Sequence, residues 1–409
     1  MDPRAELRRE LPADLSDVGS DQALLDRIRN EIRRDGPMPF ARFMELALYD
    51  AEGGYYRGPV ARPGRAGDFL TAPELHPIFG ASLAVALEDV WVRLGRPAPF
   101  VVREFGAGTG ILALAILDAL AHVDSPLRAA LRYEAVDVDS RRIDALATRL
   151  TAAGHGDVLA TADAGAPING VILGNEILDA LPVHRVRRRD AALREIAVDL
   201  GADGRLHEIE IEPSTPALAD RLAAEGIELV EGQTAEIGLA ADAWIGTAAR
   251  GLRRGLLVLI DYGAPAAELY DPTRRHDGTL RAYIRHQVHD DPYRHVGRQD
   301  LTAHVDVTAI EAAAHGAGLT TVGMTTQAEA LMGLGIEERL RGIQADPATT
   351  FEGYALVRAA LMRLLDPAAM GRFRVMAFGR DWPGRPADPP LRMFSFRLPV
   401  GRRDPPGVG

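Results

Sequence analysis

A short glycine-rich turn between a strand-like run and an apolar helix constrains this chain more than any other feature. Residues 100–105 read Phe-Val-Val-Arg-Glu-Phe, the turn 106–110 reads Gly-Ala-Gly-Thr-Gly, and residues 111–121 form an apolar, helix-like stretch. Glycines let a ligand approach the backbone, and the free N–H groups of a helix N-terminus favour an anionic group. The arrangement predicts a nucleotide-type ligand at this turn.

Alternating strand and helix patterns beyond the turn predict the fold class. A helix is expected over 140–150, and residues 170–173 are apolar on both faces, as in a buried parallel strand. The alternation favours an α/β fold with a doubly wound parallel sheet. Further strands are expected at 133–138, 158–161, 256–260, 320–325 and 373–378, with a hairpin over 191–212 and one more strand at 393–398.

The spacing of the glycines narrows the kind of ligand. A dinucleotide fingerprint has glycine at its first, third and sixth positions. Counted from Gly106, the third position is Gly108 but the sixth is Ile111, whereas Gly110 comes fifth. This spacing, with Glu104 just before it, resembles the loop that holds the methionine carboxylate in class I methyltransferases using S-adenosyl-L-methionine.

Polar residues follow the later strands in the order that such a site requires. Asp137 ends the second strand, where a carboxylate can accept both ribose hydroxyls. Asp163 follows the third strand, where relatives commonly place an acid on the adenine amino group, and Asn175 ends the fourth. Asp137 could instead cap the next helix, and Asp163 could be a turn acid.

Motifs outside the glycine turn resemble the MidA-type family of class I methyltransferases, over roughly residues 25–380. The resemblance implies the class I (Rossmann-like) fold and S-adenosyl-L-methionine as methyl donor. For the family's mitochondrial member it implies an arginine of a respiratory-chain subunit as acceptor. The chain departs from the family at two positions: Asp137 stands where the family more usually has Glu, and His76 stands where it usually has Ser or a similar small residue. The matching segments are 40–49, 53–56, 67–74, 79–80, 104–110, 174–183, 260–263, 278–281, Tyr283, His286, 300–306 and 376–379.

An arginine acceptor needs carboxylates, because its guanidinium stays protonated. Glu176 and Asp179 lie three residues apart beyond the fourth strand, so a helical turn would put both on one face. We expect them to clamp the acceptor, although Asp179 could instead brace the following segment. Asp261 and Tyr262 end the fifth strand at the same rim, and His304 is expected to hydrogen-bond a lid or act as a base.

A lid is expected where a Gly/Pro-rich stretch precedes a long helix. Residues 53–80 would close over the donor, with Thr71 and Glu74 either contacting it or forming a helix cap. The predicted organisation is a polar lead-in (1–20), a helical lid region (21–97), the methyltransferase domain (98–380) and a proline-rich tail (381–409). The methyltransferase domain would include an acceptor-binding insertion around 185–250 and a substrate loop around 264–310.

Composition excludes several chemistries. The chain has no cysteine, so thiol catalysis and thiolate metal sites are excluded. It has no lysine either, which excludes a Walker-type loop and Schiff-base catalysis. Five histidines between His276 and His304 lack the spacing of a metal motif, so no metal is expected.

Charge and the terminal segment bear on partners and location. The chain has 58 acidic and 47 basic residues and a net charge of −11. Because phosphate contacts need a basic surface, no nucleic-acid partner is expected. Residues 1–20 lack the apolar run of a signal peptide, which predicts a cytoplasmic protein without membrane insertion. The function predicted is methylation of a protein arginine. The alternatives are a small-molecule methyltransferase and a non-catalytic assembly partner, and the sequence leaves the oligomeric state open, a homodimer included.

Overall fold

The computed structural model describes residues 15, 18–58, 70–163, 165–384 and 388–398. Its centre is a seven-stranded sheet with the order β16-β17-β10-β5-β2-β3-β4. From β4 to β10 all neighbouring strands are parallel, whereas β17 is antiparallel to both of its neighbours. The bounds are β2 Phe100–Phe105, β3 Leu131–Val136, β4 Leu159–Ala160, β5 Ile168–Asn175, β10 Leu252–Asp261, β16 Thr320–Thr326 and β17 Arg374–Arg380.

This mixed α/β sheet confirms the predicted fold class and corrects one detail. The sequence pattern predicted a doubly wound parallel sheet and gave no direction for the late strands at 320–325 and 373–378. The direction of β17 escaped it because a strand buried on both faces is apolar throughout, whichever way it runs.

Alternate residues of the central strands enter two separate cores, one on each face of the sheet. In β10, Leu256, Val258 and Ile260 pack into one core, while Leu257 and Leu259 pack into the other. This is the two-residue period of a strand covered on both sides. The first core contains α4 Ile78–Arg93, α5 Ile111–His122, α7 Ser140–Ala152, α12 Gln327–Gly333, α13 Ile336–Ala345 and α14 Phe351–Leu365; the second contains α9 Leu239–Arg250 and α11 Val307–Gly316.

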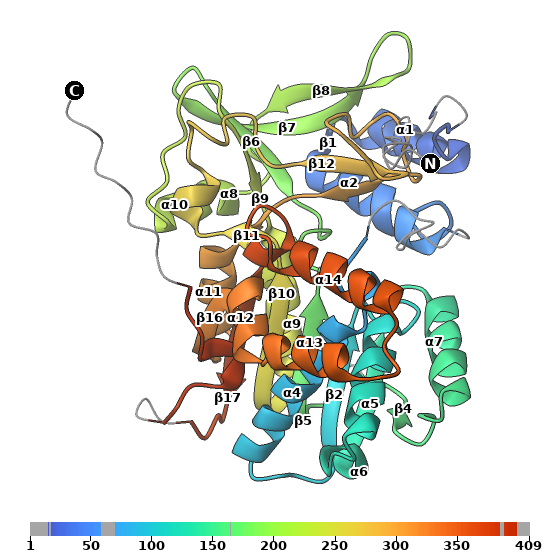
Figure 1. Cartoon of the computed structure of the whole chain (residues 1–409). Coiled ribbons are helices and arrows are strands. Elements are labelled where there is room, and N and C mark those ends of the chain that lie inside the picture. The colour runs from blue at the N-terminus through green and yellow to red at the C-terminus, as the bar shows by residue number, and fades with distance from the viewer. Residues whose placement is uncertain (1–14, 16–17, 59–69, 164, 385–387, 399–409) are drawn as a thin grey trace, which may run out of the picture.

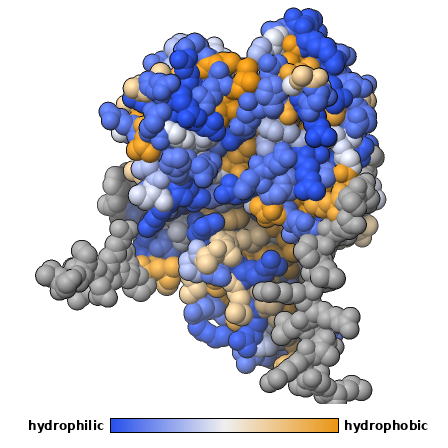
Figure 2. Space-filling model, turned by 90° about the horizontal axis from the view of Figure 1, so that it is seen from above, coloured by the Kyte–Doolittle hydropathy of each residue, from blue (hydrophilic) through white to orange (hydrophobic). Residues whose placement is uncertain are grey.

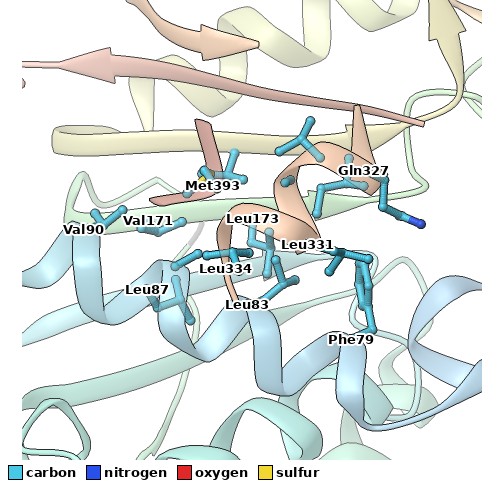
Figure 3. A pocket seen from close by; sticks show the side chains of 15 residues that line it. Phe79, Leu83, Leu87, Val90, Val171, Leu173, Gln327, Leu331, Leu334 and Met393 are labelled. Carbon is cyan, nitrogen blue, oxygen red and sulfur yellow. The ribbon is translucent and has the colours of Figure 1, made fainter. Parts of the chain in front are cut away.

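The first core holds a small apolar gap between α4 and α12 (Figure 3). Leu83 and Leu87 line it from α4, Leu331 lines it from α12, and Leu334 lines it from the residue that follows α12. Its volume is about 20 Å³, which is room for no more than about one water molecule. The gap therefore belongs to the packing of the core and is no ligand site.

A second, antiparallel sheet lies above the first in Figure 1. Its strands run β1-β7-β6-β9, with β8 paired to β7, so the predicted hairpin over 191–212 is confirmed as β7 and β8. Met38 and Pro39 of β1 pair with β7, so the N-terminal region and the insertion share one sheet. The bounds are β1 Met38–Pro39, β6 His184–Arg189, β7 Ala192–Leu200, β8 Leu206–Ile211 and β9 Thr234–Ile237, packed with α1 Gln22–Asp35, α2 Phe40–Tyr49, α8 Ala217–Ala224 and α10 Ala266–Leu269.

The remaining described elements are short. The structure assigns no strand at 393–398: the predicted strand is wrong, and a 3₁₀ turn, η3, spans Arg392–Phe394. Phe394 is buried because its ring lies over Gly323, where a Cβ atom would come within 2.5 Å of it. The other short elements are η1 Tyr55–Arg57, α3 Ala72–Leu75, α6 Leu127–Ala130, β11 Gly263–Ala264, β12 Arg281–Ile284, β13 Gln287–His289, β14 Asp300–Thr302, β15 Val305–Asp306 and η2 Met370–Arg372.

The surface over the antiparallel sheet is mostly hydrophilic, with hydrophobic residues in separate spots (Figure 2). Among the described helices, none combines the length and apolar character needed to cross a bilayer.

Candidate active site

The glycine loop, Gly106–Gly110, follows β2 at the carboxyl edge of the central sheet. All three glycines have positive φ, at 68°, 52° and 81°. A Cβ atom on Gly106 would lie 2.7 Å from Ile177, and one on Gly110 would lie 2.7 Å from Leu146. A Cβ on Gly108 would meet no atom within 4 Å. Two glycines are therefore required by internal packing, and Gly108 leaves the backbone open to a ligand.

Asp137 lies against this open position. Its Oδ2 accepts the N–H of Gly108 at 3.0 Å, and its Oδ1 accepts the N–H of Asp139, also at 3.0 Å. Asp139, not Asp137, caps α7 by accepting the N–H of Arg141. Asp137 also lines a cleft of about 720 Å³ together with residues 135–141 and, from the N-terminal region, Glu52 and Arg57.

Two other acids predicted at the cofactor site have local partners. Glu104 is buried under Tyr133, whose hydroxyl donates to it at 2.7 Å, and burial raises the pKa of Glu104 to about 8. Asp163 is exposed and accepts the N–H of Gly165 at 3.0 Å, as a turn acid does. The charge of Asp137 also acts on Glu104, so these two acids lie near each other, whereas Asp163 is bonded within its own turn.

Thr71 and Glu74 form the start of α3. Glu74 accepts the backbone N–H of Thr71 at 3.0 Å, which is the acid half of a capping box. The N–H of Ala72 donates to Oε1 of Glu176 at 3.0 Å, so α3 is anchored at the end of β5. Residues 59–69 of the predicted lid, which include the first three residues of the motif 67–74, lie outside the described residues.

Three acids, Glu176, Asp179 and Asp261, form what we call the carboxylate cluster. Oδ2 of Asp261 accepts the N–H groups of Ile177 at 3.1 Å, Leu178 at 2.8 Å and Asp179 at 3.4 Å. The N–H of Glu176, at φ 51°, donates to the carbonyl of Ile260 at 2.8 Å. The end of β10 therefore fixes the turn that carries both predicted acceptor residues.

Burial shifts the pKa of all three acids upward. It raises the pKa of Glu176 to about 8 and that of Asp179 to about 6, and it holds the pKa of Asp261 well above its usual value. Asp179 accepts a hydrogen bond from the hydroxyl of Tyr262, but its Oδ1 is buried without a partner. Within the described residues, none of the three acids makes an ion pair.

Tyrosines and a fourth acid surround the cluster. The hydroxyl of Tyr49 donates to the carbonyl of Ala180 at 3.1 Å, and that of Tyr56 donates to Asp300 at 2.9 Å. The rings of Tyr49 and Tyr56 stack at 5.5 Å. Sequence reasoning gave none of these three residues a role, and the only available signal was their position within motifs shared with the family.

Asn175 and His304 complete the predicted set. Nδ2 of Asn175 donates to Oε1 of Glu176 at 3.0 Å, so Asn175 orients an acid. The ring of His304 lies edge-on to Tyr262, at 5.2 Å. Burial and then Arg275 and its neighbouring arginines lower the pKa of His304 to about 3, which makes it a weak base at neutral pH.

The sheet order, the antiparallel β17, and a glycine loop and carboxylates at the same edge define the class I methyltransferase architecture. Residues 82–325 match the model of a family described as S-adenosyl-L-methionine-dependent methyltransferase, and the chain belongs to this family. It is therefore a methyltransferase that uses S-adenosyl-L-methionine.

Named relatives align over most of the chain. It is 28% identical to "Protein arginine methyltransferase NDUFAF7 homolog, mitochondrial" of Drosophila melanogaster, covering 92% of this chain and 89% of the relative. The mouse protein arginine methyltransferase NDUFAF7 is 27% identical, covering 87% of this chain and 84% of the relative. Because these relatives are mitochondrial proteins, the prediction of a cytoplasmic location is wrong.

A solved structure is more similar still. A Burkholderia thailandensis protein crystallised with S-adenosyl-homocysteine is 35% identical, with a TM-score of 0.82 over 91% of this chain and 95% of that one. A native crystal structure of a protein from the same organism is 34% identical, with a TM-score of 0.80 over 91% of this chain and 94% of that one. The first of these supports the predicted cofactor, because S-adenosyl-homocysteine is what the donor becomes after losing its methyl group.

Proposed function

We propose that this methyltransferase acts on the guanidinium group of a protein arginine and that the carboxylate cluster receives it. The observation that carries the proposal is the set of buried acids that form no ion pair within the described residues, above all Asp179, whose Oδ1 has no hydrogen-bond partner there. A buried carboxylate is costly unless it is paired. A guanidinium would supply both the charge and the hydrogen bonds. The names of the relatives agree with such an acceptor.

The donor fits the residues around the glycine loop. Gly108 would face it with no side chain in between, and Asp137 would accept hydrogen bonds from its ribose. When bound, S-adenosyl-L-methionine supplies a methyl group on a positively charged sulfur. The loop and Asp137 bind and orient this molecule, so their contribution to the rate is positioning.

The carboxylate cluster lies next to the donor region. β5 pairs with β2 up to Phe105 and Gly174, and the Cβ position of Gly106 lies 2.7 Å from Ile177. The turn that carries Glu176 therefore touches the glycine loop. An arginine held by Glu176 and Asp179 would approach the donor at the shared edge of the two strands.

The reaction also requires a place for one proton. As the guanidinium nitrogen bonds to the methyl carbon, the carbon–sulfur bond breaks and the nitrogen loses a proton. Oε1 of Glu176 is engaged by Ala72 and Asn175, whereas Oε2 has no hydrogen bond within the described residues. With its pKa raised by burial to about 8, Glu176 is a suitable acceptor for that proton.

The test is methylation by the Glu176→Gln variant, which removes the charge and keeps the shape. Labelled donor and lysate from the source organism are incubated with the enzyme, and labelled arginines are mapped by mass spectrometry. The variant should lose on the order of a hundredfold in rate, typical for one group that stabilises developing charge, with donor affinity nearly unchanged. Asp179→Asn should behave similarly, and the double variant should lose less than the sum of the two.

Glu228→Gln is the matched control, because Glu228 is exposed and has no ion pair or side-chain hydrogen bond within the described residues. If Glu176→Gln methylates at the parental rate, the guanidinium proposal fails. Label on a small molecule instead of a protein would identify a small-molecule methyltransferase.

A further inference from the structure

Three arginines lie near one another beside the carboxylate cluster: Arg281 begins β12, Arg275 precedes it in the preceding turn, and Arg372 ends η2 just before β17. We call Arg275, Arg281 and Arg372 the arginine cluster; the charge of each acts on His304. The ring of Tyr262 joins the two clusters: its hydroxyl bonds Asp179, and its ring contacts His304 at 5.2 Å. The same ring contacts Phe373, next to Arg372, at 5.4 Å.

A buried network fixes the segment that carries two of these arginines. Oε2 of Glu236 accepts the N–H of Thr279 at 2.6 Å and its hydroxyl at 3.0 Å. Oγ1 of Thr279 in turn accepts the N–H of His304 at 3.1 Å. Gly278, at φ 77°, has no room for a side chain, since its Cβ would lie 2.4 Å from Glu236. Arg275 and Arg281 therefore flank a rigid turn.

Ion pairs within the described residues leave most of the positive charge of the arginine cluster unpaired. Arg275 and Arg372 make no ion pair or side-chain hydrogen bond within the part of the chain that the structure describes. In the described chain Arg281 forms an ion pair only with Asp290, whose side chain is 81% exposed, at 3.4 Å. Such an exposed pair contributes little.

Arg275 is half-buried, and the like charges of Arg372 and Arg281 act on it more strongly than the opposite charges of Glu268 and Glu236. Its pKa is lowered by burial and then by Arg372 and Arg281. By contrast, the more deeply buried Arg103 and Arg185 each have a glutamate partner. A local excess of positive charge in a chain of net charge −11 is a feature that an anionic ligand would stabilise.

We propose that the arginine cluster binds carboxylate side chains of the substrate protein, so that the enzyme selects an arginine within an acidic segment. The inference rests on the proposed function, because Tyr262 places the two clusters next to each other. One would hold the guanidinium and the other the acids beside it. Opposite charges in adjacent positions set the register of a bound segment.

The test compares three synthetic peptides by calorimetry at low salt, with the enzyme saturated by S-adenosyl-homocysteine. The first is acetyl-Glu-Gly-Arg-Gly-Glu-amide, the second has Gln for both Glu, and the third has citrulline for Arg. The acidic peptide should bind about tenfold more tightly than its Gln counterpart. The Arg275→Gln/Arg372→Gln double variant should reduce this preference to less than about twofold.

Arg254→Gln is the matched control, because Arg254 is an exposed arginine near the opposite end of β10. It should keep the full preference, and thermal unfolding should show that all variants are folded. Equal binding of the Glu and Gln peptides, or a preference that survives the double variant, would overturn the proposal. So would inorganic phosphate that binds as tightly as the acidic peptide, since the site would then be a general anion site.

The citrulline peptide separates this inference from the proposed function. If it binds as tightly as the arginine peptide, and the double variant weakens both, the arginine cluster stands and the guanidinium proposal fails. If the citrulline peptide does not bind while the Glu and Gln peptides bind equally well, the guanidinium proposal stands and the acidic-segment inference fails.

Discussion

The glycine loop and the carboxylate cluster lie at neighbouring strand ends of the same sheet, yet they are assembled differently. The loop is five consecutive residues whose backbone is exposed at Gly108, with one carboxylate, Asp137, from the adjacent strand. The carboxylate cluster joins the turn after β5 to Asp261, 83 positions from Leu178 along the chain. Its acids are buried and have raised pKa values.

The difference teaches that binding a donor and activating an acceptor make different demands on a fold. A donor site needs open backbone and hydrogen-bonding groups that water can also satisfy before binding. A site for a guanidinium needs charge in a place where water does not screen it. Backbone exposure follows from a short sequence, whereas exclusion of water requires several distant segments.

The largest effect is expected for Gly108→Leu, which would fill the open position of the glycine loop. Donor affinity should fall by more than about a hundredfold, while a non-glycine residue at positive φ costs only about 1–2 kcal/mol of stability. Gly110→Ala should instead act mainly on stability, because its Cβ would collide with Leu146. Calorimetry with S-adenosyl-homocysteine and thermal unfolding measure the two effects, and an unchanged affinity in Gly108→Leu would contradict the donor assignment.

Asp261→Ala tests whether the acceptor side depends on the long-range contact. Four backbone N–H groups, those of Ile177, Leu178, Asp179 and Tyr262, would lose their acceptor, at a cost of roughly 2–4 kcal/mol in the free energy of unfolding. The methylation rate should fall by about a hundredfold as Glu176 and Asp179 lose their positions, with donor affinity little changed.

Asp261→Asn keeps an oxygen and should recover part of the stability and of the rate. Chemical denaturation and labelled-donor assays at saturating donor separate the two effects. A fully active Asp261→Ala would show that the turn after β5 holds itself in place.

The pH dependence should distinguish the two regions. Glu176 is mostly protonated below its pKa of about 8, and the proposed role requires its ionised form. At saturating donor, kcat/KM for the acceptor should therefore rise about tenfold per pH unit up to roughly pH 8. Glu176→Gln should flatten this rise. A pH-independent kcat/KM in the parent enzyme would contradict the role of Glu176.

The smallest effect is expected for Asp163→Asn. Because Asp163 is exposed and bonded within its own turn, donor affinity should change by about twofold or less. Asp137→Asn, next to Gly108, should cost about tenfold. Equal losses in the two variants would mean that donor binding draws Asp163 into the site.

The sequence alone was sufficient for the features encoded over short stretches. The positions of β2, β3, β5 and β10, the glycine loop and Asp137 follow from hydrophobic period, glycine spacing and the ends of strands. Each is dictated by backbone geometry within a few residues, so a local pattern carries it. Local patterns of the same kind also predicted the helix cap formed by Thr71 and Glu74 and the turn formed by Asp163, as alternatives to contacts with the donor.

Tertiary structure alone decided which acids are buried together. The sheet order brings together segments that are distant in the chain. Because of it, Asp261 holds the turn of Glu176, the hydroxyl of Tyr262 bonds Asp179, and Arg275 lies near Arg372. The same holds for Phe394, predicted in a strand and found packed on Gly323. Burial and the pKa shifts that follow from it are properties of the whole packed chain, because they depend on how completely distant side chains exclude water.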